Sequence, residues 1–446
     1  MRTIIASVLM VAIVLVAGGW TIETLDSDGV TGYWTSIRMD SEDRIHIVYR
    51  DDTANQLVHI FQNGTEWNSE VITTAECWFI NMVLDSEGSP HVAYWDHATS
   101  KICYACRDGS AWVISVLETA LSSDYQYPRT DIELDSYGQP HIAWYDDSGS
   151  RLRYGSWAGS AWNIVTVDSV GVTGVDPSLD LDSLDRPHIS YSNITDGTLN
   201  YAFNNGTDWE LQVVDNSGNV YGHTSIALDA NGNPHISYYY AWSPDDYVKY
   251  AWWNGSSWTI EDVNCMDWVF PGSPQGLALD SQGNAHISAD LSEFGNFLLY
   301  FFRDSSGWHE EYVDSDYTGW DNSICTDADD LSHIAYFDIN NEDLLYAHKS
   351  ATGVFEEQTS SMQPFSFHIS PNPSHSTSSV SISVAEPAAL ELTVYDLSGR
   401  AVLQAMQLDV VESSDTVILE ELVPGIYICR ITDGDIQLSE KFVVVE

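Results

Sequence analysis

The chain has 446 residues, with 16 Lys and Arg against 66 Asp and Glu, which gives a formal net charge of −50. Hydrophobic residues make up 44% and aromatic residues 12%, so the chain can bury a core, and a disordered acidic chain is excluded. The scarcity of basic residues excludes a general nucleic-acid binder and disfavours anionic membrane surfaces, because both depend on Lys and Arg. Cationic partners, divalent ions and neutral glycans remain compatible with this charge.

The first 19 residues are typical of a secretory signal peptide. Arg2 provides a short positive region, residues 4–16 are apolar, and the small residues 17–19 offer a cleavage site before Trp20. The apolar run is short for a membrane span and no second run follows, so we expect no transmembrane segment. The six cysteines have no framework spacing, and their pairing stays open.

A repeated motif organises residues 20–360. Its form Leu-Asp-Ser-x-Gly-x-Pro-His-Ile is seen at residues 134–142, and the Asp-to-His distance is constant through seven copies. Each unit contains four strand-like segments, joined by Gly-containing turns and by a Gly-x-x-Trp hairpin. The repeated histidines are His46, His91, His141, His188, His235, His286 and His333.

Four antiparallel strands repeated seven times predict an all-β fold, a seven-bladed β-propeller of four-stranded blades. Residues 20–26 resemble a fourth strand and precede the first complete unit. We therefore expect them to supply the outer strand of the last blade, although residues 354–359 compete for that place.

A different pattern follows a linker at residues 361–368. Residues 369–446 contain short alternating strands, which predict a small β-sandwich. They carry a Pro-Asn-Pro opening at 371–373, a Tyr-Asp-x-x-Gly-Arg turn at 395–400 and a Pro-Gly-x-Tyr strand at 424–427. This region closely resembles the type A C-terminal sorting domain of the Por, or type IX, secretion system. The resemblance implies contact with that secretion machinery and a secreted, extracellular or outer cell-surface location.

The repeated His and Asp are interpreted as parts of the fold. A ring of seven separate histidines does not bring three or four ligands to one metal ion, so we expect buried histidines bonded to neighbouring backbone. The repeated Asp is expected to form turns. The repeat resembles sialidase-like and neuraminidase-repeat propellers in layout, but it lacks their Ser-x-Asp-x-Gly-x-x-Trp box and an arginine triad.

Function is expected where the units differ, in the connections that meet at one end of the propeller. These connections combine aromatic residues with carboxylates, which suits sugar rings and their hydroxyls. The same aromatics would alternatively wedge between blades. The candidate ligand-binding residues are Trp34, Trp78, Trp95, Asp96, Tyr145, Asp146, Trp242, Trp268 and Trp320.

These features predict a secreted or cell-surface protein that binds a glycan without catalysis. One alternative is a propeller-type glycosidase or polysaccharide lyase, whose catalytic candidates are His97, His223, Asp96 and Asp146. Another is an adhesion module for an extracellular protein. No cofactor is expected and no metal ligands are assigned, although the Asp-rich run 327–330 leaves calcium open.

Overall fold

The structure is a computed structural model, and the chain divides into two compact units, residues 1–353 and 354–446. The described residues of the first unit are 15–17, 19–119, 128–242, 245–263, 269–271, 276–291, 297–314 and 318–349. Those of the second unit are 365–370, 378–384, 388–396, 400–410, 414–419, 422, 425–432 and 437–444.

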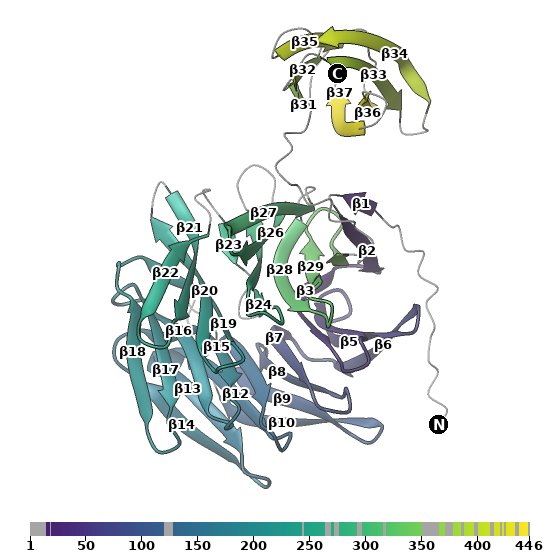
Figure 1. Cartoon of the computed structure of the whole chain (residues 1–446). Coiled ribbons are helices and arrows are strands. Elements are labelled where there is room, and N and C mark those ends of the chain that lie inside the picture. Colours follow the sequence, from purple (N-terminus) through teal and green to yellow (C-terminus); the bar gives the residue numbers. More distant parts are fainter. Residues whose placement is uncertain are drawn as a thin grey trace, which may run out of the picture. The chain divides into compact units, whose positions relative to one another are not determined.

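The described part of the first unit consists of seven antiparallel sheets, which we number in chain order (Figure 1). Sheet 1 contains β3 (Thr31–Met39), β4 (Ile45–Asp51), β5 (Gln56–Asn63) and β6 (Glu66–Thr73). Sheet 2 contains β7 (Cys77–Leu84), β8 (Pro90–Asp96), β9 (Lys101–Asp108) and β10 (Ala111–Thr119). Sheet 3 contains β11 (Thr130–Leu134), β12 (Pro140–Asp146), β13 (Arg151–Trp157) and β14 (Trp162–Asp168), with a short 3₁₀ helix, η1, at Asp147–Gly149.

The remaining sheets repeat this order. Sheet 4 contains β15 (Thr173–Leu181), β16 (Pro187–Asn193), β17 (Thr198–Asn204) and β18 (Trp209–Asp215). Sheet 5 contains β19 (Val220–Leu228), β20 (Pro234–Trp242), β21 (Asp245–Trp253) and β22 (Trp258–Asp262). Sheet 6 contains β23 (Val269–Pro271), β24 (Leu277–Leu279), β25 (Ala285–Leu291), β26 (Phe297–Asp304) and β27 (Gly307–Asp314). Sheet 7 contains β28 (Thr318–Thr326), β29 (Ser332–Asp338) and β30 (Asp343–Lys349), joined by β2 (Trp20–Asp26) and β1 (Leu15–Ala17).

The first strand of each sheet contacts the first strand of the next, and the first strand of sheet 7 contacts β3 of sheet 1. The sheets therefore surround a common axis, as in a β-propeller (Figure 1). The ring is completed by the N-terminal strand β2, which pairs with β30 from Trp20↔Lys349 to Asp26↔Leu344. This confirms the prediction for residues 20–26, whereas the competing residues 354–359 lie outside the described residues.

The repeated residues lock each sheet internally. In six sheets the repeated His contacts a Tyr hydroxyl through Nδ1 and faces the repeated Asp through Nε2. In sheet 4, for example, the Tyr201 hydroxyl lies 2.6 Å from His188 Nδ1, and Asp182 Oδ2 lies 3.6 Å from His188 Nε2. The histidines are thus buried parts of the repeat, but their partners are side chains rather than the predicted backbone. The Asp also forms the predicted turn, since its other oxygen accepts backbone N–H groups.

Tryptophans from the Gly-x-x-Trp hairpins connect neighbouring sheets. Trp209 of sheet 4, for example, packs edge-on against Tyr154 of sheet 3, with ring centres 5.1 Å apart. At the closure, Trp20 packs in the same way against Tyr300 at 5.1 Å, and its exposed fraction is 0%. These repeated tryptophans wedge between neighbouring sheets.

The second unit consists of two antiparallel sheets in its described residues. One has the order β31 (Phe365–Ser370), β32 (Ser378–Val384) and β35 (Ser414–Leu419). The other has the order β34 (Ala401–Val410), β33 (Ala388–Asp396), β36 (Gly425–Thr432) and β37 (Gln437–Val444). Leu392, Val394, Cys429 and Ile431 are buried in this unit.

Candidate functional site

The inner strands of five sheets share a bulge at the end away from the repeat turn. In each, the register against the second strand shifts, and one residue has a positive φ between 48° and 53°. Left-handed backbone is uncommon outside glycine and costs free energy, so it marks positions where a side chain is re-aimed. The five residues are Trp34, Phe79, Asp176, His223 and Asp321.

These bulges gather side chains at one end of the axial channel. Arg129 joins them, since its Nε lies 2.8 Å from Asp176 Oδ1 and its guanidinium lies 4.8 Å from the Phe79 ring centre. Asp176 Oδ2 also accepts the His223 backbone N–H at 2.8 Å. We call these six residues, the five with positive φ and Arg129, the mouth cluster.

Asp321 ties the cluster to the first sheet. Its Oδ2 accepts the backbone N–H of Trp34 at 3.1 Å, and burial raises the pKa of its carboxyl. Trp34, Phe79, Arg129 and Asp321 together line a small cavity. The cluster thus combines an indole, a cation and two carboxylates whose positions are held by hydrogen bonds.

An aromatic platform adjoins the mouth cluster. Trp34 stacks on Trp78 with ring centres 4.8 Å apart, and Trp78 stacks on His97 at 4.2 Å. Both tryptophans are half-buried, and Trp95 packs edge-on against Trp78 with an exposed fraction of only 1%. Trp34, Trp78 and His97 are therefore brought together as a stack, with Trp95 as its support.

Three of the predicted ligand residues are instead part of the core. Trp95, Tyr145 and Asp146 are at most 1% exposed. Asp146 accepts hydrogen bonds from Arg151 Nε at 2.7 Å and from the Ser148 hydroxyl, which secures the loop after β12. The structure thus places these three residues in the interior of their sheets.

The other predicted residues are dispersed. Asp96 accepts hydrogen bonds from the backbone and hydroxyl of Thr99, which stabilises a turn. Trp320 is 42% exposed and precedes Asp321 of the mouth cluster. His223 contributes its backbone N–H to Asp176, as described above. The side chain of Trp242 and all of Trp268 lie outside the described residues.

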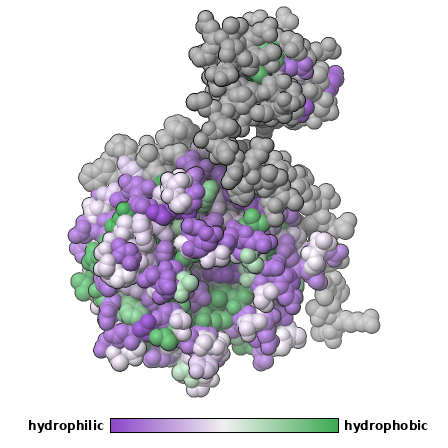
Figure 2. Space-filling model, viewed as in Figure 1, coloured by the Kyte–Doolittle hydropathy of each residue, from purple (hydrophilic) through white to green (hydrophobic). Residues whose placement is uncertain are grey.

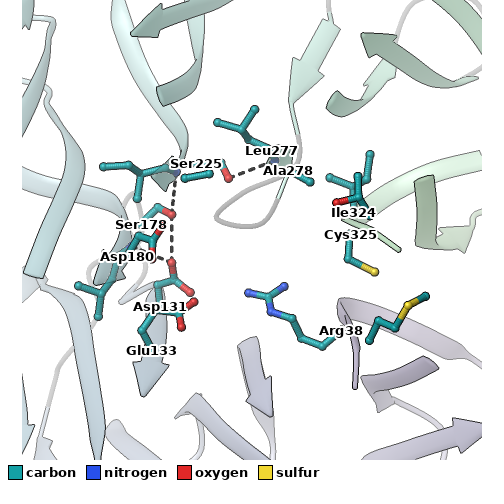
Figure 3. A pocket seen from close by; sticks show the side chains of 15 residues that line it. Arg38, Asp131, Glu133, Ser178, Asp180, Ser225, Leu277, Ala278, Ile324 and Cys325 are labelled. Atoms are coloured by element: carbon teal, nitrogen blue, oxygen red, sulfur yellow. Dashed lines mark hydrogen bonds between the residues drawn. The ribbon is translucent and has the colours of Figure 1, made fainter. Parts of the chain in front are cut away.

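A second group of charged residues lies toward the other end of the inner strands, close to the repeat turns. A cavity of about 290 Å³ is lined by the inner strands of six sheets. Arg38 extends into it from sheet 1 and points toward Asp131 and Glu133 of sheet 3 (Figure 3). Asp180 of sheet 4 lies beside them (Figure 3).

The carboxyls of this cavity are held by adjacent strands. Asp131 Oδ2 accepts the Ser178 hydroxyl at 3.0 Å and the Leu179 backbone N–H at 2.8 Å. Asp180 accepts the Leu228 backbone N–H at 2.8 Å. Burial raises the pKa of Asp131 to about 6 and of Asp180 to about 7, while burial and the Asp180 charge raise the pKa of Glu133 to about 8.

Asp131, Glu133 and Asp180 are absent from the residues predicted from sequence. A signal was present, because Glu133 and Asp180 occupy the middle of the Ile-x-Leu segment, where other units have Val83, Ala227 or Ala278. Among the residues that the structure describes, no group of three His, Cys, Asp or Glu side chains has the geometry to hold a metal ion.

Comparison with known families identifies the C-terminal region. Residues 368–445 match the family model of the secretion system C-terminal sorting domain. The protein is therefore exported by the type IX route to the cell surface or the extracellular space, and this domain implies contact with the secretion machinery. No helix in the described residues is long and apolar enough to cross a membrane. No curated protein matches the chain.

The chain is similar to several solved structures. A polysaccharide lyase of the PL25 ulvan lyase family has a TM-score of 0.53 and 12% identity, covering 72% of this chain and 95% of its own. A fungal alcohol oxidase of the AA5 family, solved with copper, has a TM-score of 0.51 and 11% identity, covering 95% and 98%. An intramolecular trans-sialidase from Ruminococcus gnavus has a TM-score of 0.38 and 9% identity, covering 73% and 95%. At these identities the two likenesses with a TM-score above 0.5 concern the propeller-like all-β fold alone.

Proposed function

We propose that this exported protein binds a glycan, without catalysis, at the mouth cluster and the stack beside it. In this proposal the first unit is a seven-bladed β-propeller whose repeat resembles the sialidase-like type, and the second is a small β-sandwich that serves as the sorting domain. The cyclic contacts of the seven sheets and the two sheets of the second unit support this division.

The observation that carries the proposal is the stack of Trp34 and Trp78 next to charged side chains at one end of the channel. An indole face suits the apolar face of a sugar ring, and carboxylates and guanidinium groups bind its hydroxyls. The bulges and hydrogen bonds fix these groups before a ligand arrives, which lowers the entropic cost of binding.

The full secreted chain should be tested on a glycan array, with and without calcium. Replacing Trp34 or Trp78 by Ala should weaken specific binding by about tenfold or more, because each replacement removes one ring of the stack. Trp253→Ala is the matched control, since Trp253 lies in an outer hairpin where it packs against Trp258 at 5.7 Å. No glycan bound under either condition would contradict the proposal and direct the search to an extracellular protein partner.

A second candidate function rests on the channel carboxyls. Glu133 and Asp180 are held with raised pKa values in one cavity with Arg38, and a carboxyl that stays protonated near neutral pH suits a general acid. A propeller-type glycosidase or polysaccharide lyase would therefore act here rather than at His97, His223, Asp96 or Asp146. New reducing ends or unsaturated products from a polysaccharide panel, lost in Glu133→Gln, would favour this enzyme over the binding protein.

A further inference from the structure

One position of the repeat differs between sheets and affects how neighbouring sheets pack. It is the residue on the third strand that pairs with the repeated His of the second strand. In five sheets this residue carries a ring: Phe61, Phe203, Trp252, Phe302 and His348. In sheet 2 the same position is Cys106, and in sheet 3 it is Ser156. Sheets 2 and 3 therefore lack a ring that the repeat otherwise places there.

The rings pack against the repeated residues of their own sheets. Phe203 lies 4.6 Å from His188 between ring centres, and Trp252 stacks on Tyr250 at 5.4 Å. Phe203 and Trp252 also pack against clusters that include a hairpin Trp of the next sheet. The rings thus fill part of the space between two neighbouring sheets.

A cavity lies between sheets 2 and 3, beside Cys106, where the ring is missing. Its volume is about 280 Å³, and its lining includes Tyr104, Cys106 and Val113 from sheet 2 and Pro140 and Trp157 from sheet 3. Engineered apolar cavities of about 150 Å³ in protein cores already bind benzene. The space beside Cys106 is therefore large enough for one aromatic ring and a small substituent.

The wall opposite Cys106 is formed by Trp157, which pairs with the hairpin Trp162. The equivalent residue varies between sheets: it is Trp253 in sheet 5, and it is Arg303 and Lys349 in sheets 6 and 7. Those cations cover the ring of the preceding sheet, at 4.9 Å for Arg303 over Trp252. In the gap between sheets 2 and 3 this position holds the indole of Trp157, which offers an aromatic face to whatever occupies the cavity.

We propose that the cavity beside Cys106 binds a small molecule through one aromatic ring, which takes the place of the ring found in the other sheets and lies against Trp157. The polar side chains of Ser115 and Gln139 also line the cavity, so a ring with one hydroxyl or N–H group fits its chemistry. This inference is independent of the glycan proposal, because it uses none of the residues of the mouth cluster.

The test is calorimetric titration of the full chain with two aromatic compounds, phenol and indole. Cyclohexanol and methyl glucoside, whose rings are not aromatic, serve as controls. Cys106→Phe restores the repeat residue and should abolish binding of the aromatic probes. Ser156→Phe makes the same change in the next sheet and should leave binding intact. Trp157→Ala should weaken binding by about tenfold while leaving the rest of the cavity in place.

Thermal unfolding of each variant establishes that it folds, and Trp157→Ala supplies a second test where Cys106→Phe does not fold. Binding of phenol or indole that is lost in Cys106→Phe and kept in Ser156→Phe supports the inference. No binding of either aromatic probe, or unchanged binding in both Cys106→Phe and Trp157→Ala, overturns it. Equal or tighter binding of methyl glucoside or cyclohexanol at this cavity also overturns it.

Discussion

Replacing Glu133 by Gln should change the pH dependence of stability in a defined direction. Glu133 lies in the axial cavity, where burial and the Asp180 charge raise its pKa from 4.5 to about 8. The folded state therefore holds a proton that the unfolded chain releases above pH 4.5. The stabilising contribution of this proton is complete below that pH and is lost as the pH rises toward 8.

The size of the effect follows from the pKa shift. One pKa unit corresponds to about 1.4 kcal/mol, so the shift of Glu133 sets a ceiling of about 5 kcal/mol for this loss. Part of that ceiling is repulsion shared with Asp180, and Glu133 is partly exposed, so we expect about 2 kcal/mol for Glu133 alone. Gln keeps the shape of the side chain and cannot ionise, which removes the pH-dependent part of the cost.

Urea unfolding from about pH 5 to about pH 9 measures this difference. Glu133→Gln should unfold like the unmodified protein or slightly more easily at the acidic end, and it should be more stable at the alkaline end. The exposed Glu66 provides the control, because Glu66→Gln should not alter the slope. Parallel pH profiles for Glu133→Gln and the unmodified protein would refute the account of the cavity.

Two further predictions concern the repeat. Trp20→Ala removes a fully buried side chain at the closing strand and should lower the free energy of unfolding by about 3–5 kcal/mol, measured by urea unfolding. A loss under about 1 kcal/mol would show that the closure does not depend on Trp20. In sheet 1, His59 stands where the other sheets have Tyr, and its Nε2 lies 3.0 Å from His46 Nδ1. Burial, followed by the charge of His59, lowers the pKa of His46 from 6.5 to about 4. Because the unfolded chain takes up a proton at higher pH than the folded protein does, the free energy of unfolding falls as the pH drops from 6.5 toward 4. His59→Tyr should therefore move acid unfolding, followed by circular dichroism, to lower pH, and an unchanged midpoint would contradict this assignment.

The fold was largely predictable because its determinants are local and repeated. Asp182 and His188 lie six residues apart, and both the turn and the strand that they specify form within that distance. The closing role of residues 20–26 was predictable for the same reason, since their pattern matches that of other fourth strands. The side-chain partner of each His, Tyr in six sheets and His59 in sheet 1, was not predictable, because it depends on the pairing of the second and third strands.

The candidate site was predictable only in part. The sequence places Trp34 and Trp78 in variable connections, but their stacking depends on bulges that are not visible in a strand pattern. Glu133 was missed because alternation assigns it to one face of a strand without revealing that this face lines the axis. The burial of Tyr145 and Asp146 was not predictable, since residues at the end of a strand face inward or outward according to the neighbouring sheet.

The pairing of β2 with β30 also governs how the first unit assembles. Trp20 meets Lys349, so the two partners of the closing pair lie at opposite ends of the unit and their contact order is very high. A chain emerging during export cannot complete sheet 7 until its last strand has arrived, and the loop-closure entropy of that step opposes it until then. Once joined, the circle has no terminal repeat that can fray, unlike an open solenoid. We therefore expect slow but highly cooperative folding, and removal of either end strand should destabilise the whole circle rather than one sheet.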